Sequence, residues 1–110
     1  MKQINLEKLA AAFAGMEQVL ARAQGGSKDY EALLEFRRYC WSALLLVDDL
    51  ECQDQIDRLV RYAKELYSDC ERARVDSLRA DIATALGAVR ERLQSLERGY
   101  GKRWRDLRAA

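Results

Sequence analysis

The C-terminal segment, residues 99–110, combines aromatic, aliphatic and basic side chains at helical spacing. Tyr100, Trp104 and Leu107 recur at intervals of four and three, so in a helix they share one face. Basic residues surround that face, and the candidate partner-binding set is Tyr100, Arg103, Trp104, Arg105, Leu107 and Arg108, with Lys102 beside them. This composition suits a helix that anchors in an acidic-rimmed groove of a partner protein.

Two other interpretations of the segment remain open at the level of sequence. The arginines could bind phosphates while Trp104 stacks on a base, which would make the segment a nucleic-acid-binding element. Alternatively, Trp104 and Leu107 could fold back onto the domain as a further piece of its core.

Arg37 is anomalous because its helical phase lies between those of Leu33 and Leu44, inside an apolar arc. A buried guanidinium needs a carboxylate or several carbonyl partners. We expect either an internal pair with an acidic residue of a neighbouring helix, or a stem that reaches along the surface to water. The alternative is an interface arginine at a partner or self-association surface.

Ala83 and Gly87 form a patch of small residues beside the apolar seam of the last long helical segment. Such a patch permits a close helix–helix contact with a second chain. The simpler interpretation, which we favour, is an ordinary helix face in which alanine is present for its helix propensity.

Catalytic and metal-binding patterns are absent from the sequence. There is no His to serve as general base or metal ligand, no Gly-rich phosphate loop and no G-x-S-x-G turn. Five acidic residues lie close together without the spacing or central Gly of a calcium-binding loop: Asp48, Asp49, Glu51, Asp54 and Asp57. We therefore predict a protein that is not an enzyme and that binds no metal or cofactor.

Three cysteines, Cys40, Cys52 and Cys70, lie 12 and 18 residues apart with no CxxC pair. Cys40 and Cys70 fall on apolar helix faces, so we expect buried thiols there and a stability loss on replacement concentrated at those two positions. Reduced thiols, the lack of an apolar run long enough for a membrane span and the lack of a signal-like N-terminus predict a cytoplasmic protein.

The net charge of +1 conceals an uneven distribution. Residues 1–55 carry six basic and nine acidic side chains, whereas residues 56–110 carry thirteen basic and nine acidic ones. The last thirteen residues alone hold five basic groups and one acidic group, so the positive excess belongs to the C-terminal end and not to the domain as a whole.

The segment that must organise all of these residues is 30–47, the most apolar of the chain, which lacks Gly and Pro. Wound as a helix, it is apolar around most of its circumference, so other helices should cover it on several sides. We predict an all-α protein, an antiparallel four-helix bundle, with three helices and a very long last helix as the alternative.

Capping residues and glycines predict where the helices begin and end. Helix 5–24 should start at an Asn5 cap and stop at Gly25–Gly26, and the next should be capped by Ser27 or Asp29. We expect a turn within 47–54 with a capping box from Asp48 to Glu51, and another box from Ser68 to Glu71 that starts the last helix. Gly99 and Gly101 should end it, which divides the chain into a bundle domain, 1–98, and a basic tail, 99–110.

These features together predict a small non-catalytic protein-binding module that acts through its helix faces and its tail. Bacterial or phage-encoded adaptors, secretion-type chaperones, anti-activators and inhibitors of host factors share this size and helical character. The expected partner is another protein, with a homodimer as the expected assembly because the last helix is over-long. A small nucleic-acid-binding regulator that uses the basic tail is the alternative function.

Overall fold

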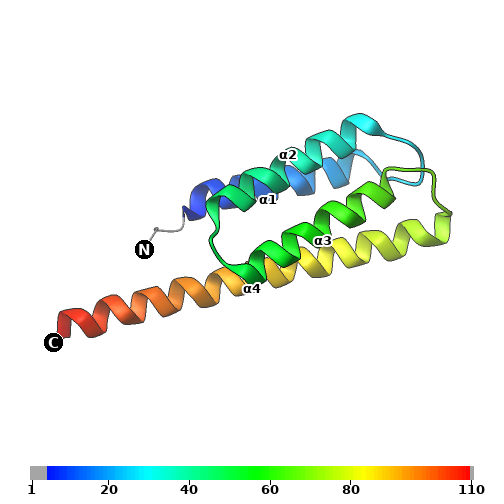
Figure 1. The fold of residues 1–110 in the computed structure, drawn as a ribbon. Helices are drawn as coiled ribbons and strands as arrows, with labels where there is room; N and C mark the ends of the chain where they lie inside the picture. The colour runs from blue at the N-terminus through cyan, green and yellow to red at the C-terminus, as the bar shows by residue number, and fades with distance from the viewer. Residues whose placement is uncertain (1–4, 110) are drawn as a thin grey trace.

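The computed structural model describes the backbone of residues 5–109 and the side chains of residues 5–96. Within this part the chain forms four helices: α1 (Leu6–Arg22), α2 (Tyr30–Leu46), α3 (Leu50–Leu66) and α4 (Arg72–Ala109). Consecutive helices run antiparallel and pack as α1 on α2, α2 on α3 and α3 on α4 (Figure 1). The predicted all-α four-helix bundle is confirmed, and the three-helix alternative is wrong because a break separates α3 from α4.

Three side-chain caps begin the first three helices, because the first backbone N–H groups of a helix have no intrahelical acceptor. Asn5 accepts a hydrogen bond from the Lys8 N–H at 3.1 Å, and Asp29 accepts one from the Ala32 N–H at 3.1 Å, as the sequence predicts. At α3 the cap is Asp49 and not Asp48, since Asp49 accepts a hydrogen bond from the Cys52 N–H at 3.0 Å.

Ser68 does not form the predicted capping box with Glu71. Its hydroxyl donates to the carbonyl of Glu65 at 2.7 Å, so it satisfies the C-terminal end of α3 and not the N-terminal end of α4. The position of the predicted break is nevertheless confirmed, because α3 ends at Leu66 and α4 begins at Arg72.

Glycines act where the chain turns or where two helices approach closely. Gly25 and Gly26 have positive φ angles of 92° and 86°, which residues with a Cβ atom rarely adopt. This backbone conformation turns the chain from α1 towards α2. At Gly15 an added Cβ would collide with the ring of Tyr39, so this glycine permits the close packing of α1 on α2.

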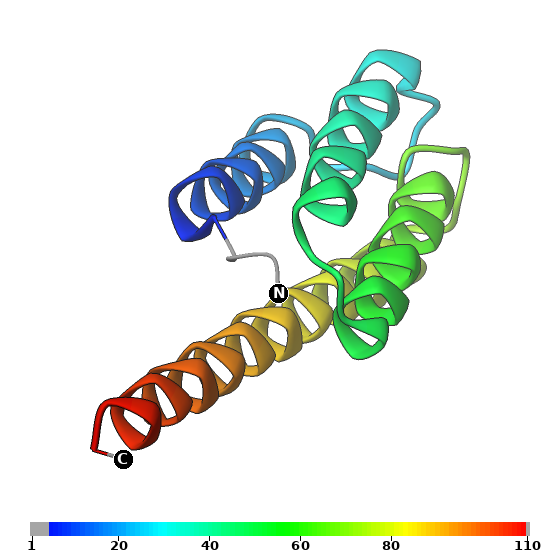
Figure 2. The same cartoon turned by 60° about the vertical axis from the view of Figure 1, so that its left-hand side comes forward.

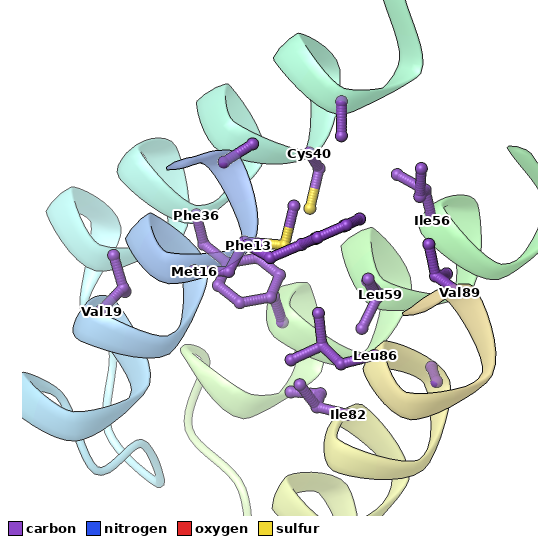
Figure 3. Close-up of a cluster of buried hydrophobic side chains, with 14 of the residues drawn as sticks. Phe13, Met16, Val19, Phe36, Cys40, Ile56, Leu59, Ile82, Leu86 and Val89 are labelled. Atoms are coloured by element: carbon purple, nitrogen blue, oxygen red, sulfur yellow. The ribbon is translucent and has the colours of Figure 1, made fainter. Parts of the chain in front are cut away.

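The interior is filled by apolar side chains from all four helices (Figure 3). Fully buried members, with at most 1% of their surface exposed, include Leu9, Met16, Phe36, Cys40, Ile56, Leu59, Ile82 and Val89. Within each helix they lie three, four or seven residues apart, which is the periodicity from which the helices are predicted.

The last helix extends well beyond the bundle, and the prediction that it ends at Gly99 and Gly101 is wrong. The helix continues through both positions to Ala109. A glycine lowers helix stability by about 1 kcal/mol relative to alanine, but it ends a helix only when the chain adopts a capping turn there. At about 1.5 Å per residue the 38 residues of α4 span roughly 57 Å, which accounts for the 59 Å long axis of the molecule (Figures 1 and 2).

Candidate interaction surfaces

The outward side of α2 carries a continuous row of large side chains. We define the α2 outer face as Tyr30, Leu34, Arg37, Trp41 and Leu45, which follow one another at spacings of four, three, four and four residues. The exposed fractions of its four uncharged members are 65% for Tyr30, 41% for Leu34, 54% for Trp41 and 88% for Leu45. In a helix this spacing places all five within about 80° of rotation.

The opposite side of α2 faces the core through Ala32, Phe36, Cys40 and Ala43, all of them buried. Helix α2 packs on α1 and α3, but no other described helix lies over its outer face (Figures 1 and 2). The bundle therefore wraps this helix less completely than the sequence predicts, and one of its two apolar faces remains in contact with solvent.

Arg37 lies in the middle of this face and stacks on its neighbour. Its guanidinium carbon is 5.0 Å from the centroid of the Trp41 ring, within the range of a cation–π contact. Its Nε is buried and has no hydrogen-bond partner among the described residues. The internal pair, one of the two intramolecular arrangements expected from the sequence, is therefore not formed among the described residues.

A shallow groove of about 420 Å³ begins at Tyr30 and lies between α2 and α3. Its lining is mostly apolar, with a basic rim, and consists of Lys28, Tyr30, Leu33, Arg61, Lys64, Glu65, Tyr67 and Ser68. The Glu65 carboxylate is bound by Arg74 at 2.9 Å, whereas Lys28 and Lys64 form no ion pair with a described residue. The groove therefore extends the α2 outer face into a region of positive charge.

Ala83 and Gly87 line a second groove, of about 290 Å³, between α1 and α4. Both residues are exposed, and a Cβ added at Gly87 would meet no atom within 4 Å. Across this groove Arg90 bridges to Glu17 at 2.6 Å and lies 5.8 Å from the Phe13 ring centroid. The small patch is thus open, and no described element contacts Gly87 there.

Arg79 joins α4 to the end of α1, a role that the sequence analysis did not predict. It donates hydrogen bonds to the carbonyls of Leu20 at 2.7 Å, Ala23 at 3.2 Å and Gln24 at 3.1 Å. The Tyr67 hydroxyl also donates to the Ala23 carbonyl, at 3.1 Å, and burial raises the pKa of Tyr67 to about 12. The only hint would have been the general attraction of cations to helix C-termini, which names no particular residue.

Four of the five acidic residues near the start of α3, all except Asp48, have an arginine partner among the described residues. Asp49 caps α3 and receives a fork of hydrogen bonds from Arg92, at 3.1 and 3.3 Å, which lowers the pKa of its carboxyl below the usual range. The remaining partners within this group are Glu51 with Arg92, Asp54 with Arg58 and Asp57 with Arg61. Among the described residues no three side chains of His, Cys, Asp or Glu come together as a metal site would require.

Two cysteines are fully buried, but they are not the pair that the sequence predicts. Cys40 and Cys52 expose 0% of their surface, whereas Cys70 is only partly buried. Cys52 lies one turn before Ile56, on the buried face of α3. Burial raises the pKa of both the Cys40 and the Cys52 thiol to about 12, so neither forms a reactive thiolate at neutral pH.

The predicted tail residues lie on the projecting part of α4: Tyr100, Arg103, Trp104, Arg105, Leu107 and Arg108. Their side chains lie outside the described residues, so only the helical backbone of this segment is established. Among the helices described, none is both long enough and apolar enough to cross a membrane.

No protein family, curated protein or solved structure matches this chain.

Proposed function

We propose that this protein is a small non-catalytic protein-binding module whose main contact surface is the α2 outer face. A single observation carries the proposal: a row of exposed large apolar side chains at helical spacing, with an incompletely satisfied arginine among them. Contiguous exposed apolar surface of this kind usually marks an interaction site. Trp, Tyr and Arg are also the residues that contribute most to binding at protein interfaces.

Burial of this surface by a partner would contribute a substantial favourable term to binding. At 150–250 Å² for a whole aromatic side chain, the exposed parts of Tyr30 and Trp41 amount to roughly 250 Å². Burial at about 25 cal/mol per Å² would contribute about 6 kcal/mol before the entropic costs of association are subtracted. Leu34 and Leu45 add further apolar area.

Several biological roles fit such a module: an adaptor, a secretion-type chaperone, an anti-activator or an inhibitor of a host factor, encoded by a bacterium or a phage. A cytoplasmic location belongs to the same proposal, and three free cysteines support it because thiols persist in a reducing compartment.

The projecting part of α4 is the second contact element in this proposal. Residues 97–109 continue the helix past the bundle, where its backbone can reach a partner. A homodimer formed along α4 is supported by the same projection and by the open patch at Ala83 and Gly87, where a second helix would meet no obstructing side chain at Gly87. Light scattering behind a sizing column should then give a dimer mass at micromolar concentration.

Nucleic-acid binding through the basic segment is the second candidate function, because Lys102, Arg103, Arg105 and Arg108 lie on this projecting helix. The body of the protein offers little support, since many of its arginines are engaged in ion pairs or carbonyl contacts, including Arg74, Arg79, Arg90 and Arg92. Salt separates the two functions: phosphate contacts weaken steeply as salt rises, whereas an apolar contact does not.

Affinity capture from an extract of the native host tests the proposed function. The wild-type chain is compared with Leu45→Asp, which places a charge on the most exposed apolar side chain of the α2 outer face, and with Arg58→Ala as a control on the exposed side of α3. We expect proteins that wild type and Arg58→Ala retain and that Leu45→Asp loses while its circular dichroism is unchanged. Retention of the same proteins by all three variants would refute the role of this face.

A further inference from the structure

We propose that the α2 outer face receives one amphipathic helix of a different protein, and that this helix carries an Asp or Glu whose carboxylate accepts hydrogen bonds from Arg37. The inference rests on the proposed protein-binding function and adds the chemical nature of the partner. It follows from the shape of the row, the unsatisfied Nε of Arg37 and the distribution of charge around the face.

The shape of the surface suits a helix. From Tyr30 to Leu45 the row covers fifteen steps along α2, or roughly 22 Å, in a narrow stripe parallel to the helix axis. The groove between α2 and α3 adjoins one end of this stripe, where Tyr30 and Leu33 line it. A helix with apolar residues at spacings of three and four presents a matching stripe, which is the usual mode of helix-in-groove recognition.

The chemistry of Arg37 selects an acidic group. Its Nε is already out of contact with water and unpartnered, and covering the face would also remove water from the rest of the guanidinium. A desolvated cation is costly unless it is paired, and a carboxylate satisfies a guanidinium with two parallel hydrogen bonds. No carboxylate among the described residues forms an ion pair with Arg37, so we infer that a partner supplies the acceptor.

The charges around the face favour the same partner. Lys28 and Lys64 rim the adjoining groove and have no ion-pair partner among the described residues. Together with Arg37 they make the apolar row attractive to a helix with an acidic residue within its apolar stripe and further acidic residues at one end.

A second copy of the same helix does not meet these requirements. Consider two α2 helices that pair antiparallel so that Tyr30 of one copy faces Leu45 of the other. In this register the numbers of facing residues add to 75, so Arg37 of one copy faces Arg38 of the other. In a parallel pair each position faces itself, so Arg37 meets Arg37. Both arrangements that cover the whole row oppose like charges in a desolvated contact, which is unfavourable.

A peptide selection with the full-length protein tests the inference. The probe is a phage-displayed library of one helix-forming 20-residue sequence with six positions of one face randomised. It is selected on the wild-type chain and counter-selected on Leu45→Asp. We expect enriched sequences with apolar residues at i, i+4 and i+7 and an Asp or Glu between them.

Synthetic versions of an enriched peptide then isolate the carboxylate. Replacing its acidic residue by Gln should weaken binding to wild type by about tenfold or more, as expected for the loss of a charge-assisted hydrogen bond. The same replacement should have no effect on binding to Arg37→Gln. In the charge-swapped pair, Arg37→Glu should lose the acidic peptide and bind the version with Lys at that position.

Other outcomes overturn the inference in distinguishable ways. Enriched peptides without an acidic preference, or a Gln version that binds equally well, would remove the carboxylate but leave the protein-binding function. A selection without any binder dependent on the α2 outer face would overturn both. A dimer that Leu45→Asp converts to a monomer of unchanged helicity would assign the face to a second copy and also overturn the inference.

Discussion

Removing the Arg79 guanidinium should lower the free energy of unfolding more than removing any ordinary surface arginine. The side chain reaches from α4 to three carbonyls at the end of α1, an end where the last carbonyls of the helix lack intrahelical donors. The substitution Arg79→Met keeps most of the stem and its packing but removes all three hydrogen bonds, so it tests the polar contact alone.

The expected loss follows from the number and exposure of these bonds. A hydrogen bond to a charged group contributes about 1.5–3 kcal/mol when it is well buried. The bonds to Leu20 and Ala23 are partly buried and the one to Gln24 is exposed, so water can replace part of what is lost. We therefore expect a total of about 2–3 kcal/mol, which for a domain of this size lowers the melting temperature by about 10–15 °C.

Urea denaturation followed by circular dichroism measures the loss directly, with Arg58→Met as the matched control. Arg58 forms only an exposed pair with Asp54 one turn away, at 3.3 Å, so its replacement should change stability by less than about 0.5 kcal/mol. If Arg79→Met and Arg58→Met unfold at the same urea concentration, the contact between α4 and α1 contributes nothing and the reasoning is refuted.

A second variant tests whether the shared carbonyl couples two donors. Tyr67→Phe removes the other hydrogen bond to the Ala23 carbonyl and should by itself cost about 1 kcal/mol. In the double variant with Arg79→Met this carbonyl loses both side-chain donors, so the combined loss should exceed the sum of the single losses by about 0.5–1 kcal/mol. Strictly additive losses would mean that water satisfies this carbonyl fully.

Three further predictions concern the thiols, one carboxylate and the projecting helix. In urea denaturation, Cys40→Ser should lower the free energy of unfolding by about 1–3 kcal/mol because it buries a hydroxyl. Cys52→Ser should cost less because Asp49 can accept a hydrogen bond from the new hydroxyl, and Cys70→Ser, at a partly exposed position, should cost under about 0.5 kcal/mol. An equal cost at all three positions would contradict the observed burial of these residues. Asp49→Asn should destabilise the protein at pH 7. Because folding lowers the pKa of this carboxyl, its contribution to stability is present above the unfolded-state pKa and is lost as pH falls through the folded-state pKa. The urea-unfolding curves of wild type and Asp49→Asn should therefore converge in acid. A stability difference that stays constant with pH would refute the assignment. A chain that stops at Arg98 should melt within a few degrees of the full protein and lose the part of its partner affinity that the projecting helix contributes. A fall of ten degrees or more would instead show that the removed segment belongs to the core.

Local sequence information predicted the elements of this fold well. The spacing of apolar residues gave the four helices, and Asn5 and Asp29 gave two of their caps, because each such signal involves residues that are close together in the chain. The errors are of the same local kind: the α3 cap is shifted by one residue to Asp49, and the helix continues through Gly99 and Gly101. At α3, Asp48 and Asp49 are adjacent and either could act as the cap. In α4, no capping turn forms at Gly99 or Gly101, so the helix continues.

What the sequence could not decide depends on which helix lies beside which. Both faces of α2 are apolar, and only the packing of α1 and α3 shows that the Phe36 side is buried while the Trp41 side is open. Arg79 reaches carbonyls more than fifty residues away, a contact that leaves no trace in local periodicity. The sequence alone thus determined the helices and the anomaly at Arg37, whereas only the tertiary structure decided that no carboxylate of the described residues pairs with it, because pairing depends on distances between segments remote in the chain.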